Sequence, residues 1–199
     1  TDITAADGSK ILKGGLIEII TFGADGQASC NTDLPFGTYY IQELTTDNHY
    51  VLDTKQYSFT FAYGNQNEEI IDLAVNNGNP IINKLKYGQI LGLKLDEDGS
   101  AVAGSKFGLF SINETEYDEE HAFYIAESQE DGTFEFNNIP YGTWNVKEIK
   151  APLGFVLNQE IYPVTISEDG DVIRLEIENR HIYGTVHTTK IDKDYPDNK

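Results

Sequence analysis

The feature that most constrains this chain is an internal repeat. The segment "LPFGTYYIQELTTDNHYVLDTKQYSFTF" (34–61) has a counterpart in "IPYGTWNVKEIKAPLGFVLNQEIYPVTI" (139–166). Both read apolar–Pro–aromatic–Gly–Thr–aromatic, place a glutamate at the same offset (Glu43 and Glu148), and continue to an aromatic residue followed by Val-Leu. Self-similarity of this kind indicates tandem homologous domains, so one folding pattern must serve the chain twice.

A second pair of matching segments marks the junctions between the repeats. "INKLKYGQILGLKLD" (82–96) resembles "ENRHIYGTVHTTKID" (178–192). We therefore predict a first repeat at 1–86, a second repeat at 87–183, and a stub at 184–199 that holds a linker and the first strand of a third domain. The length of 199 residues suits two small domains.

The residue pattern of each repeat predicts strands. Segments such as "YSFTFAY", "FEFNNI", "WNVKEI" and "DVIRLEIEN" are rich in aromatic and β-branched residues and alternate apolar with polar positions. Turn signals such as "ADG", "EDG" and "PYG" separate them. Convincing helical periodicity is absent from the sequence. An all-β chain of two β-sandwiches is the expected fold class.

Composition excludes several kinds of partner. The formal net charge of −19 would repel phosphate backbones, so we expect no nucleic-acid partner. Because no apolar run approaches the length of a membrane span, we expect no membrane insertion in this fragment. The single cysteine, Cys30, cannot form a disulfide within the chain and is predicted to be a half-buried structural thiol.

Three polar residues of the second repeat fall on the apolar side of a predicted strand. They are Glu148 in "WNVKE", Asn179 in "LEIEN" and Lys94 in "ILGLK". The assignment of Lys94 is the least clear, because leucines occupy the alternate positions on the opposite face. Taken singly, each residue is best explained as a strand-end or surface residue whose polar group reaches water.

As a set, the three residues suggest a chemical role. Burial lowers the pKa of a lysine and raises that of a glutamate, which yields a neutral amine nucleophile and a carboxyl that can shuttle protons. The amine can then attack the asparagine amide and release ammonia, leaving an isopeptide crosslink that needs no cofactor. The recurrence of the glutamate and the asparagine in the first repeat, at Glu43 and Asn83, favours this interpretation.

Several motifs together resemble a known family. "LKLD" (93–96), "AGSKFGLF" (103–110), "PYGTWNVKE" with its "APLGFVL" tail, and the closing "IEN" are similar to the Cna protein B-type, or SpaA-type pilin (prealbumin-like), domains of Gram-positive surface proteins. The resemblance covers essentially the whole chain. It implies tandem immunoglobulin-like Greek-key β-sandwiches whose first and last strands lie side by side.

The resemblance also implies roles for residues and for the whole protein. Lys94 would be the nucleophile, Asn179 the acceptor and Glu148 the catalytic acid of an autocatalytic isopeptide bond. The protein would be a structural stalk module of a cell-wall-anchored, extracellular adhesin or pilus-associated protein, and not an enzyme acting on other molecules. Its partners would be neighbouring domains of the same protein. Because no Val-Tyr-Pro-Lys-like motif is present, an adhesin stalk or accessory subunit is favoured over a polymerising shaft subunit.

The first repeat departs from this pattern. Glu43 and Asn83 match the acid and the acceptor, but the matching lysine would immediately precede Thr1, and Lys10 and Lys13 both lie past the first strand. We therefore expect no crosslink in this repeat. In the stub, Lys190 of "TKID" matches Lys94 and is expected to serve a third domain, although strand pairing of 184–199 with a neighbouring molecule is an alternative.

Two other functions compete with a stalk. An adhesive module that binds a host surface or matrix protein or a glycan would use the acidic loop 113–131, "NETEYDEEHAFYIAESQED", although an extra strand flanked by a solvated loop explains that segment better. A conventional enzyme or metal site would use His121, His181 or His187, which lack ligand spacing. We therefore predict no metal site.

Overall fold

The computed structural model describes residues 2–4, 8–64, 67, 71–190 and 193. The chain forms two compact units, Thr1–Thr46 with Leu52–Lys84, and Asp47–Val51 with Leu85–Lys199. Strands dominate both units, and the described residues contain one short 3-10 helix, η1 (Val75–Gly78). The predicted all-β fold class is confirmed, whereas the boundaries predicted between the repeats stay a prediction.

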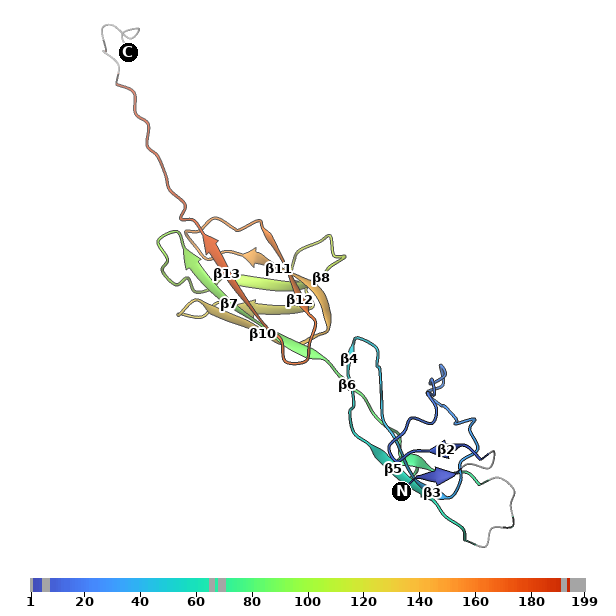
Figure 1. The fold of residues 1–199 in the computed structure, drawn as a ribbon. Helices are drawn as coiled ribbons and strands as arrows, with labels where there is room; N and C mark the ends of the chain where they lie inside the picture. Colours follow the sequence, from blue (N-terminus) through green and yellow to red (C-terminus); the bar gives the residue numbers. More distant parts are fainter. Residues whose placement is uncertain (1, 5–7, 65–66, 68–70, 191–192, 194–199) are drawn as a thin grey trace. The chain divides into compact units, whose positions relative to one another are not determined.

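The first sheet of the second repeat brings its first and last strands together. It has three strands in the order β10 (Thr133–Pro140), β7 (Tyr87–Asp96) and β13 (Val172–Asn179). β7 and β13 run parallel (Figure 1). In this pair, Ile177 lies opposite Lys94 and Asn179 opposite Asp96. A parallel pair needs a long crossover connection, and here nearly the whole domain provides it.

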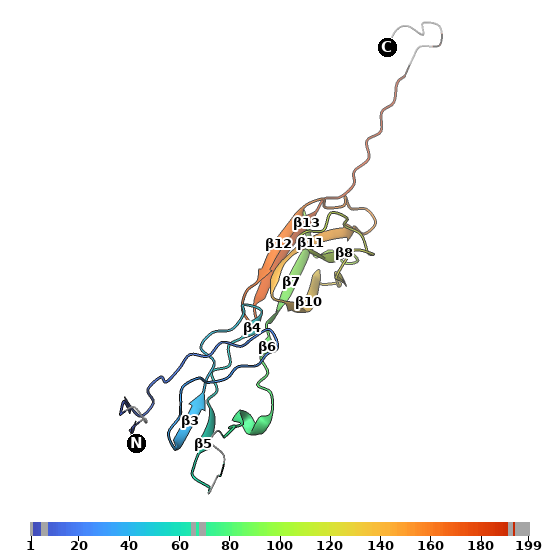
Figure 2. The same cartoon turned by 90° about the vertical axis from the view of Figure 1, so that its right-hand side faces the viewer.

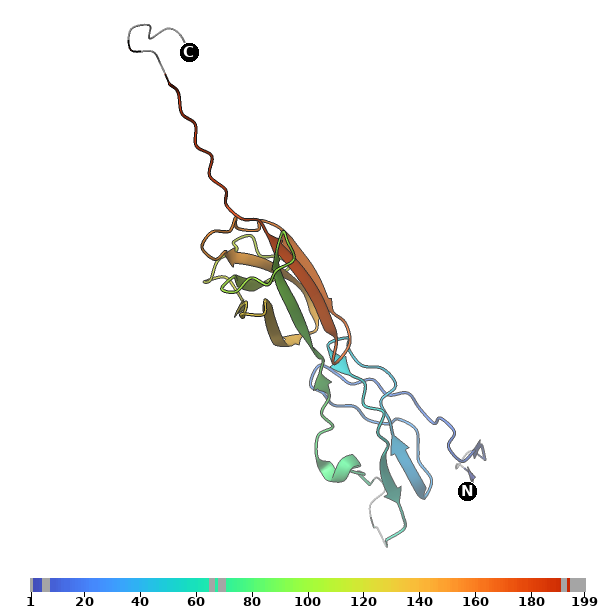
Figure 3. The same ribbon diagram turned by 90° about the vertical axis from the view of Figure 1, so that its left-hand side faces the viewer.

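The second sheet faces the first. It has four antiparallel strands in the order β12 (Ile161–Ile166), β11 (Gly142–Lys150), β8 (Lys106–Ser111) and β9 (Tyr124–Glu127). Figures 2 and 3 show this sandwich from two opposite sides. β9 is the extra strand predicted within 113–131, and it forms one edge of the sheet.

Alternate residues of both sheets fill the space between them. The buried apolar side chains that pack together are Ile90, Phe107, Leu109, Phe134, Phe136, Ile139, Val146, Val164, Ile166 and Ile177. Since about 25 cal/mol is gained per Å² of apolar surface removed from water, this cluster is the main source of the domain's stability.

Glycine decides which face of β7 is buried. The alternating face of β7 that contains Ile90, Gly92 and Lys94 is buried, while the leucines between them are only half-buried. A Cβ on Gly92 would lie 2.0 Å from the ring of Phe134, which stacks on Phe107 with ring centroids 3.9 Å apart. Because Gly92 has no side chain, the Phe134 ring packs directly on the face of β7 that carries Lys94. This face, with Lys94 on it, is therefore part of the core.

The first repeat is built from short strand pairs. β1 (Ile3–Thr4) pairs with β2 (Lys10–Ile11), β3 (Gly37–Ile41) pairs with β5 (Tyr57–Phe61), and β4 (Tyr50–Val51) pairs with β6 (Lys84–Leu85). Among its described residues, Tyr39 is the one buried apolar side chain.

The environment of Cys30 differs from the prediction. Its thiol is exposed rather than half-buried, and it contacts the carboxylate of Glu18 at 3.0 Å. The short strand pairs of this repeat leave the segment around Cys30 outside any sheet, so no packed layer covers the thiol. Desolvation by the surrounding atoms and the hydrogen bond to the Glu18 carboxylate raise the pKa of Cys30, which disfavours the reactive thiolate.

Candidate crosslinking site

Three polar side chains from three strands are buried in the sandwich of the second repeat. Lys94 comes from β7, Glu148 from β11 and Asn179 from β13, and their exposed fractions are 0%, 0% and 2%. Charged and amide groups are rarely this deeply buried unless they form ion pairs or hydrogen bonds, because desolvation of an unpaired ion costs several kcal/mol.

The acid and the amide of this site are hydrogen-bonded to each other. The Nδ2 group of Asn179 donates to Oε1 of Glu148 at 2.9 Å and to Oε2 at 3.0 Å. The backbone N–H of Asn158 also donates to Oε2, at 2.7 Å. The Oδ1 atom of Asn179 is buried without a hydrogen-bond partner among the described residues. The amide nitrogen of Asn179 is thus directly against a carboxylate.

The amine of Lys94 is held nearby by backbone oxygens. Its Nζ donates to the carbonyl of Ile177 at 3.0 Å and approaches that of Leu95 at 3.3 Å. Desolvation lowers the pKa of Lys94 to about 8, against the opposing effect of the negative charges of Glu148 and Glu178. A lysine that loses its proton this readily can supply a neutral amine, which is a nucleophile.

The strand pairing explains why these groups lie in one place. Lys94 is opposite Ile177, and Asn179 is two residues further along the same face of the neighbouring parallel strand. Glu148 is opposite Phe107 in the facing sheet, so its carboxylate enters the core from the other side. The arrangement can support attack of the amine on the amide carbon, with the leaving nitrogen already in contact with an acid.

The first repeat holds a similar acid–amide pair. Nδ2 of Asn83 donates to Oε1 of Glu43 at 2.7 Å and to the hydroxyl of Thr46 at 2.7 Å. Both side chains are only half-buried, and the alternative amines of Lys10 and Lys13 belong to exposed residues.

The structure describes only part of the stub, the segment 184–199 that is predicted to begin a third domain. Residues 184–190, including Lys190, are exposed, and the rest of the stub lies outside the described residues except for Lys193. The predicted roles of Lys190 and of strand pairing through 184–199 therefore stay predictions.

One contact of the acid was missed from the sequence. The backbone N–H of Asn158 binds Glu148, and that of Asp53 binds Glu43 at 2.8 Å, in each case across 10 residues. The signal was present in the repeat, because Asp53 and Asn158 occupy the same offset after the glutamate in the two matching segments.

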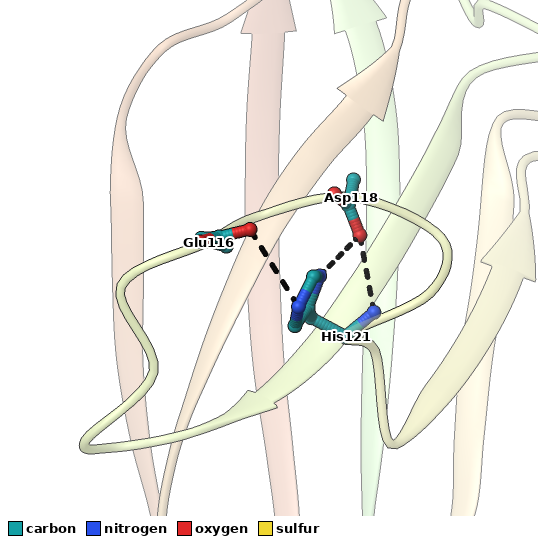
Figure 4. Close-up of side chains that lie close together, drawn as sticks. All are labelled: Glu116, Asp118 and His121. Atoms are coloured by element: carbon teal, nitrogen blue, oxygen red, sulfur yellow. Dashed lines mark hydrogen bonds and ion pairs between the residues drawn. The ribbon is translucent and has the colours of Figure 1, made fainter.

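The histidines lie apart from this site. Nδ1 of His121 is 2.7 Å from Oδ1 of Asp118, and its Nε2 is 3.6 Å from Oε2 of Glu116 (Figure 4). These three exposed residues form the one group of three potential metal ligands in the described part of the chain. Both ring nitrogens already face carboxylates, and the hydrogen bond to Asp118 raises the pKa of His121. His181 contacts Glu97 at 3.1 Å, and His187 is exposed.

A family model for the SpaA prealbumin-like fold domain matches the chain twice, at residues 2–79 and 88–181. The chain therefore belongs to this family, as the sequence motifs suggested, and the two tandem copies are confirmed. Comparison with curated proteins returns no match.

Among the solved structures that match the chain, the Bacillus anthracis TIE protein shares its fold. The Bacillus anthracis TIE protein is 21% identical with a TM-score of 0.66 over 86% of this chain and 30% of that chain. GBS52, the minor pilin of Streptococcus agalactiae, is 20% identical with a TM-score of 0.44 over 86% of this chain and 71% of that chain. BcpA, the major pilin subunit of Bacillus cereus, is 24% identical with a TM-score of 0.41 over 55% and 36%. The chain thus spans under a third of the TIE protein's length.

No helix in the described ranges has the length and apolar character needed to cross a membrane.

Proposed function

We propose that this chain is a structural stalk segment of an extracellular, cell-wall-anchored adhesin or pilus-associated protein, whose second repeat staples itself with an isopeptide bond between Lys94 and Asn179. The observation that carries the proposal is the dry contact between Glu148 and the amide nitrogen of Asn179, beside a buried lysine whose pKa is lowered to about 8. Membership of the prealbumin-like family supports the same role.

The proposed chemistry is balanced within the three side chains. The Lys94 ammonium passes one proton to the Glu148 carboxylate, which leaves a neutral amine and a carboxylic acid. The amine attacks Cγ of Asn179, Glu148 protonates Nδ2, and the Cγ–Nδ2 bond breaks to release ammonia. The proton shed by the attacking nitrogen returns to Glu148, so an amide bond forms with no external reactant.

The crosslink would suit a protein under tension. It would join the first and last strands of the domain, β7 and β13, and so close a loop of nearly the whole second repeat. On the chain-entropy model used for disulfides, a loop of this size stabilises a domain by about 4–5 kcal/mol. Force applied along the chain would then pass through a covalent bond, and an amide resists reduction where a disulfide does not.

Intact-protein mass spectrometry tests the proposal directly. The purified chain should be one ammonia lighter than its sequence mass, and a proteolytic digest should contain a branched peptide that joins Lys94 to Asn179. A full sequence mass, with Lys94 and Asn179 in separate peptides, would overturn the crosslink.

Adhesion to a host protein or glycan is a second candidate function. Phe123, Tyr124 and Ile125 are 50%, 43% and 45% exposed, and Phe123 lines a hollow of about 540 Å³ together with Trp144 and Tyr141. Exposed apolar clusters of this kind often mark contact surfaces. Adhesion would be favoured if the chain binds matrix proteins and Phe123→Ser and Ile125→Ser abolish this binding, while each variant still lacks one ammonia relative to its own sequence mass. Equal binding by these variants would exclude this surface.

A further inference from the structure

The tail of the repeated motif covers a strand edge in the second repeat. β13 is the last strand of its sheet, so its outer edge has no strand partner there. Residues 154–158, "GFVLN", run beside the end of β13 and the residues that follow it, and we call them the edge loop. Unpaired strand edges fray or pair wrongly, so a covering segment has a structural value of its own.

The edge loop forms hydrogen bonds with the residue before Asn179 and with the residue after it. Before the acceptor, Nδ2 of Asn158 donates to the carbonyl of Glu178 at 3.0 Å. After it, the N–H of Val156 donates to the carbonyl of Arg180 at 2.8 Å. β13 ends at Asn179, and the last residue of a strand frays easily. These hydrogen bonds therefore fix the position of the Asn179 backbone along the strand direction.

Asn158 links the acceptor strand to the acid. Its backbone N–H donates to Glu148, and its side chain donates to the carbonyl of Glu178, the residue just before the acceptor. The side chain is itself fixed, since Oδ1 accepts from the N–H of Glu160 at 2.8 Å and Nδ2 also contacts the hydroxyl of Tyr162 at 3.0 Å. A single residue thus spans the two sheets at the site.

The first repeat has the backbone hydrogen bond to the glutamate but lacks the side-chain hydrogen bond to the acceptor strand. Asp53 stands where Asn158 stands, and its backbone N–H binds Glu43 in the same way. The Asp53 carboxylate accepts from the N–H of Lys55 at 2.9 Å and from the hydroxyl of Tyr57 at 2.6 Å. An ionised carboxylate has no proton to donate to a carbonyl, so it cannot replace the bond from Asn158 to the acceptor strand.

We propose that Asn158 is a positioning residue for the crosslinking reaction, which holds the strand carrying Asn179 in register with Glu148. This inference rests on the proposed function. The Asn158 side chain touches neither the amine nor the amide that reacts, and it acts through the backbone of Glu178. Its loss should slow bond formation without changing which groups titrate during the reaction.

The test is Asn158→Asp, which installs the residue of the first repeat. This change keeps the backbone bond to Glu148 and the turn to Glu160, and removes the donor to Glu178. Chain made in a short cell-free pulse would be followed by intact mass, at a temperature low enough to resolve the wild-type conversion. We expect about a tenfold lower rate of ammonia loss, which is the effect of losing one hydrogen bond.

Two further measurements separate positioning from simple destabilisation. In a Lys94→Met background, which cannot crosslink, Asn158→Asp should remain fully folded at the assay temperature by circular dichroism. The pH profile of the crosslinking rate should keep its midpoint while its plateau falls, because Lys94 makes its hydrogen bonds to the carbonyls of Leu95 and Ile177 and not to Asn158. Asn113→Asp, at an exposed position in the β8–β9 loop, makes the same change of charge and should react at the wild-type rate.

Each outcome assigns a cause. If the wild-type chain keeps its full mass, the proposed crosslink fails. If the wild-type chain loses ammonia and Asn158→Asp loses it at the same rate, the positioning role of Asn158 is overturned while the crosslink stands. The same conclusion holds if Asn158→Asp and Asn113→Asp slow the reaction equally, because the added charge would then explain the effect. A midpoint shifted toward the ordinary lysine pKa would also overturn it, because the variant would then act through the charge or hydration around Lys94 and not through the position of the acceptor strand.

Discussion

The two repeats carry the same acid–amide pair in different surroundings. In the second repeat, Glu148 and Asn179 are sealed between two sheets with exposed fractions of 0% and 2%. In the first repeat, Glu43 and Asn83 make the same hydrogen bond while half-buried among short strand pairs. The motif alone therefore places an acid against an amide, and the packing around it decides whether water is excluded.

The difference in burial matters because the proposed crosslinking reaction depends on the exclusion of water from the site. A carboxylate and an ammonium exchange a proton readily only where neither charge is well solvated. Water at a half-buried site solvates both charges and competes for their hydrogen bonds, so the first repeat should be the poorer catalyst even when a lysine is supplied. The following predictions test this contrast, from the largest expected effect to the smallest.

Loss of the acid in the second repeat should have the largest effect. Glu148→Ala should restore the full sequence mass and lower the stability of this repeat by about 4–5 kcal/mol, because the staple is lost. Calorimetry and intact mass measure the two effects. Glu43→Ala is the matched control in the first repeat, and this variant should still be one ammonia lighter than its own sequence mass. A Glu148→Ala chain that still lacks one ammonia would contradict the assigned role of Glu148.

Supplying a lysine to the first repeat should create a second, slower crosslink. We would join "QILGLK", the sequence of 89–94, ahead of Thr1, so that its lysine takes the place of Lys94 in the motif. The extended chain should lose a second ammonia at a lower rate than the first, because Glu43 and Asn83 are half-buried. Adding Asn83→Ala should prevent only the second loss. Equal rates for both losses would show that dryness does not set the difference.

The rate of crosslinking in the second repeat should fall above pH 8. The reaction needs the proton of the Lys94 ammonium, because that proton is passed on to the nitrogen that leaves as ammonia. Since the pKa of Lys94 is about 8, that proton is lost to solvent as the pH rises through this value. The rate should be flat just below pH 8 and fall about tenfold per pH unit above it. A rate that instead rises through pH 8 would mean that Glu148 acts only as a base.

The smallest effect should come from the β8–β9 loop, which the first repeat lacks. Asp118→Asn should lower the pKa of His121, because the hydrogen bond that the imidazole donates to the Asp118 carboxylate is the main cause of its raised value. NMR titration of the imidazole measures the shift. Glu116→Gln should lower the pKa less, since its oxygen is 3.6 Å from the ring rather than 2.7 Å. Any stabilisation by this pairing is present at low pH and is lost as the pH rises through the pKa of His121. A larger shift from Glu116→Gln would contradict this ranking of the two contacts.

Local patterns were sufficient to predict much of the architecture. The repeat, the strand-rich composition, and the extra strand within 113–131 follow from alternation and turn residues, which depend on neighbours in sequence. The turns at "DEDGS" and "SEDGD" also follow from local chemistry, since Asp96 and Asp171 use their carboxylates to cap backbone N–H groups.

The face of β7 could not be predicted with the same certainty. Hydrophobicity favours the leucines as the buried side, yet Lys94 is buried because Gly92 leaves room for the ring of Phe134. That choice depends on a side chain some 40 positions away, which no local pattern contains. The exposure of Cys30 was mispredicted for a related reason, because no sheet covers its segment.

The sequence by itself determined that one β-rich domain occurs twice and that each copy carries a glutamate and an asparagine in matching segments, because periodicity and repeated offsets are local properties of the chain. The tertiary structure alone decided that β13 lies parallel to β7, that the site in the second repeat is dry, and that Asn158 ties the acid to the acceptor strand. These features arise from contacts between segments far apart in the chain, and solvent exclusion is a property of the whole packed sandwich.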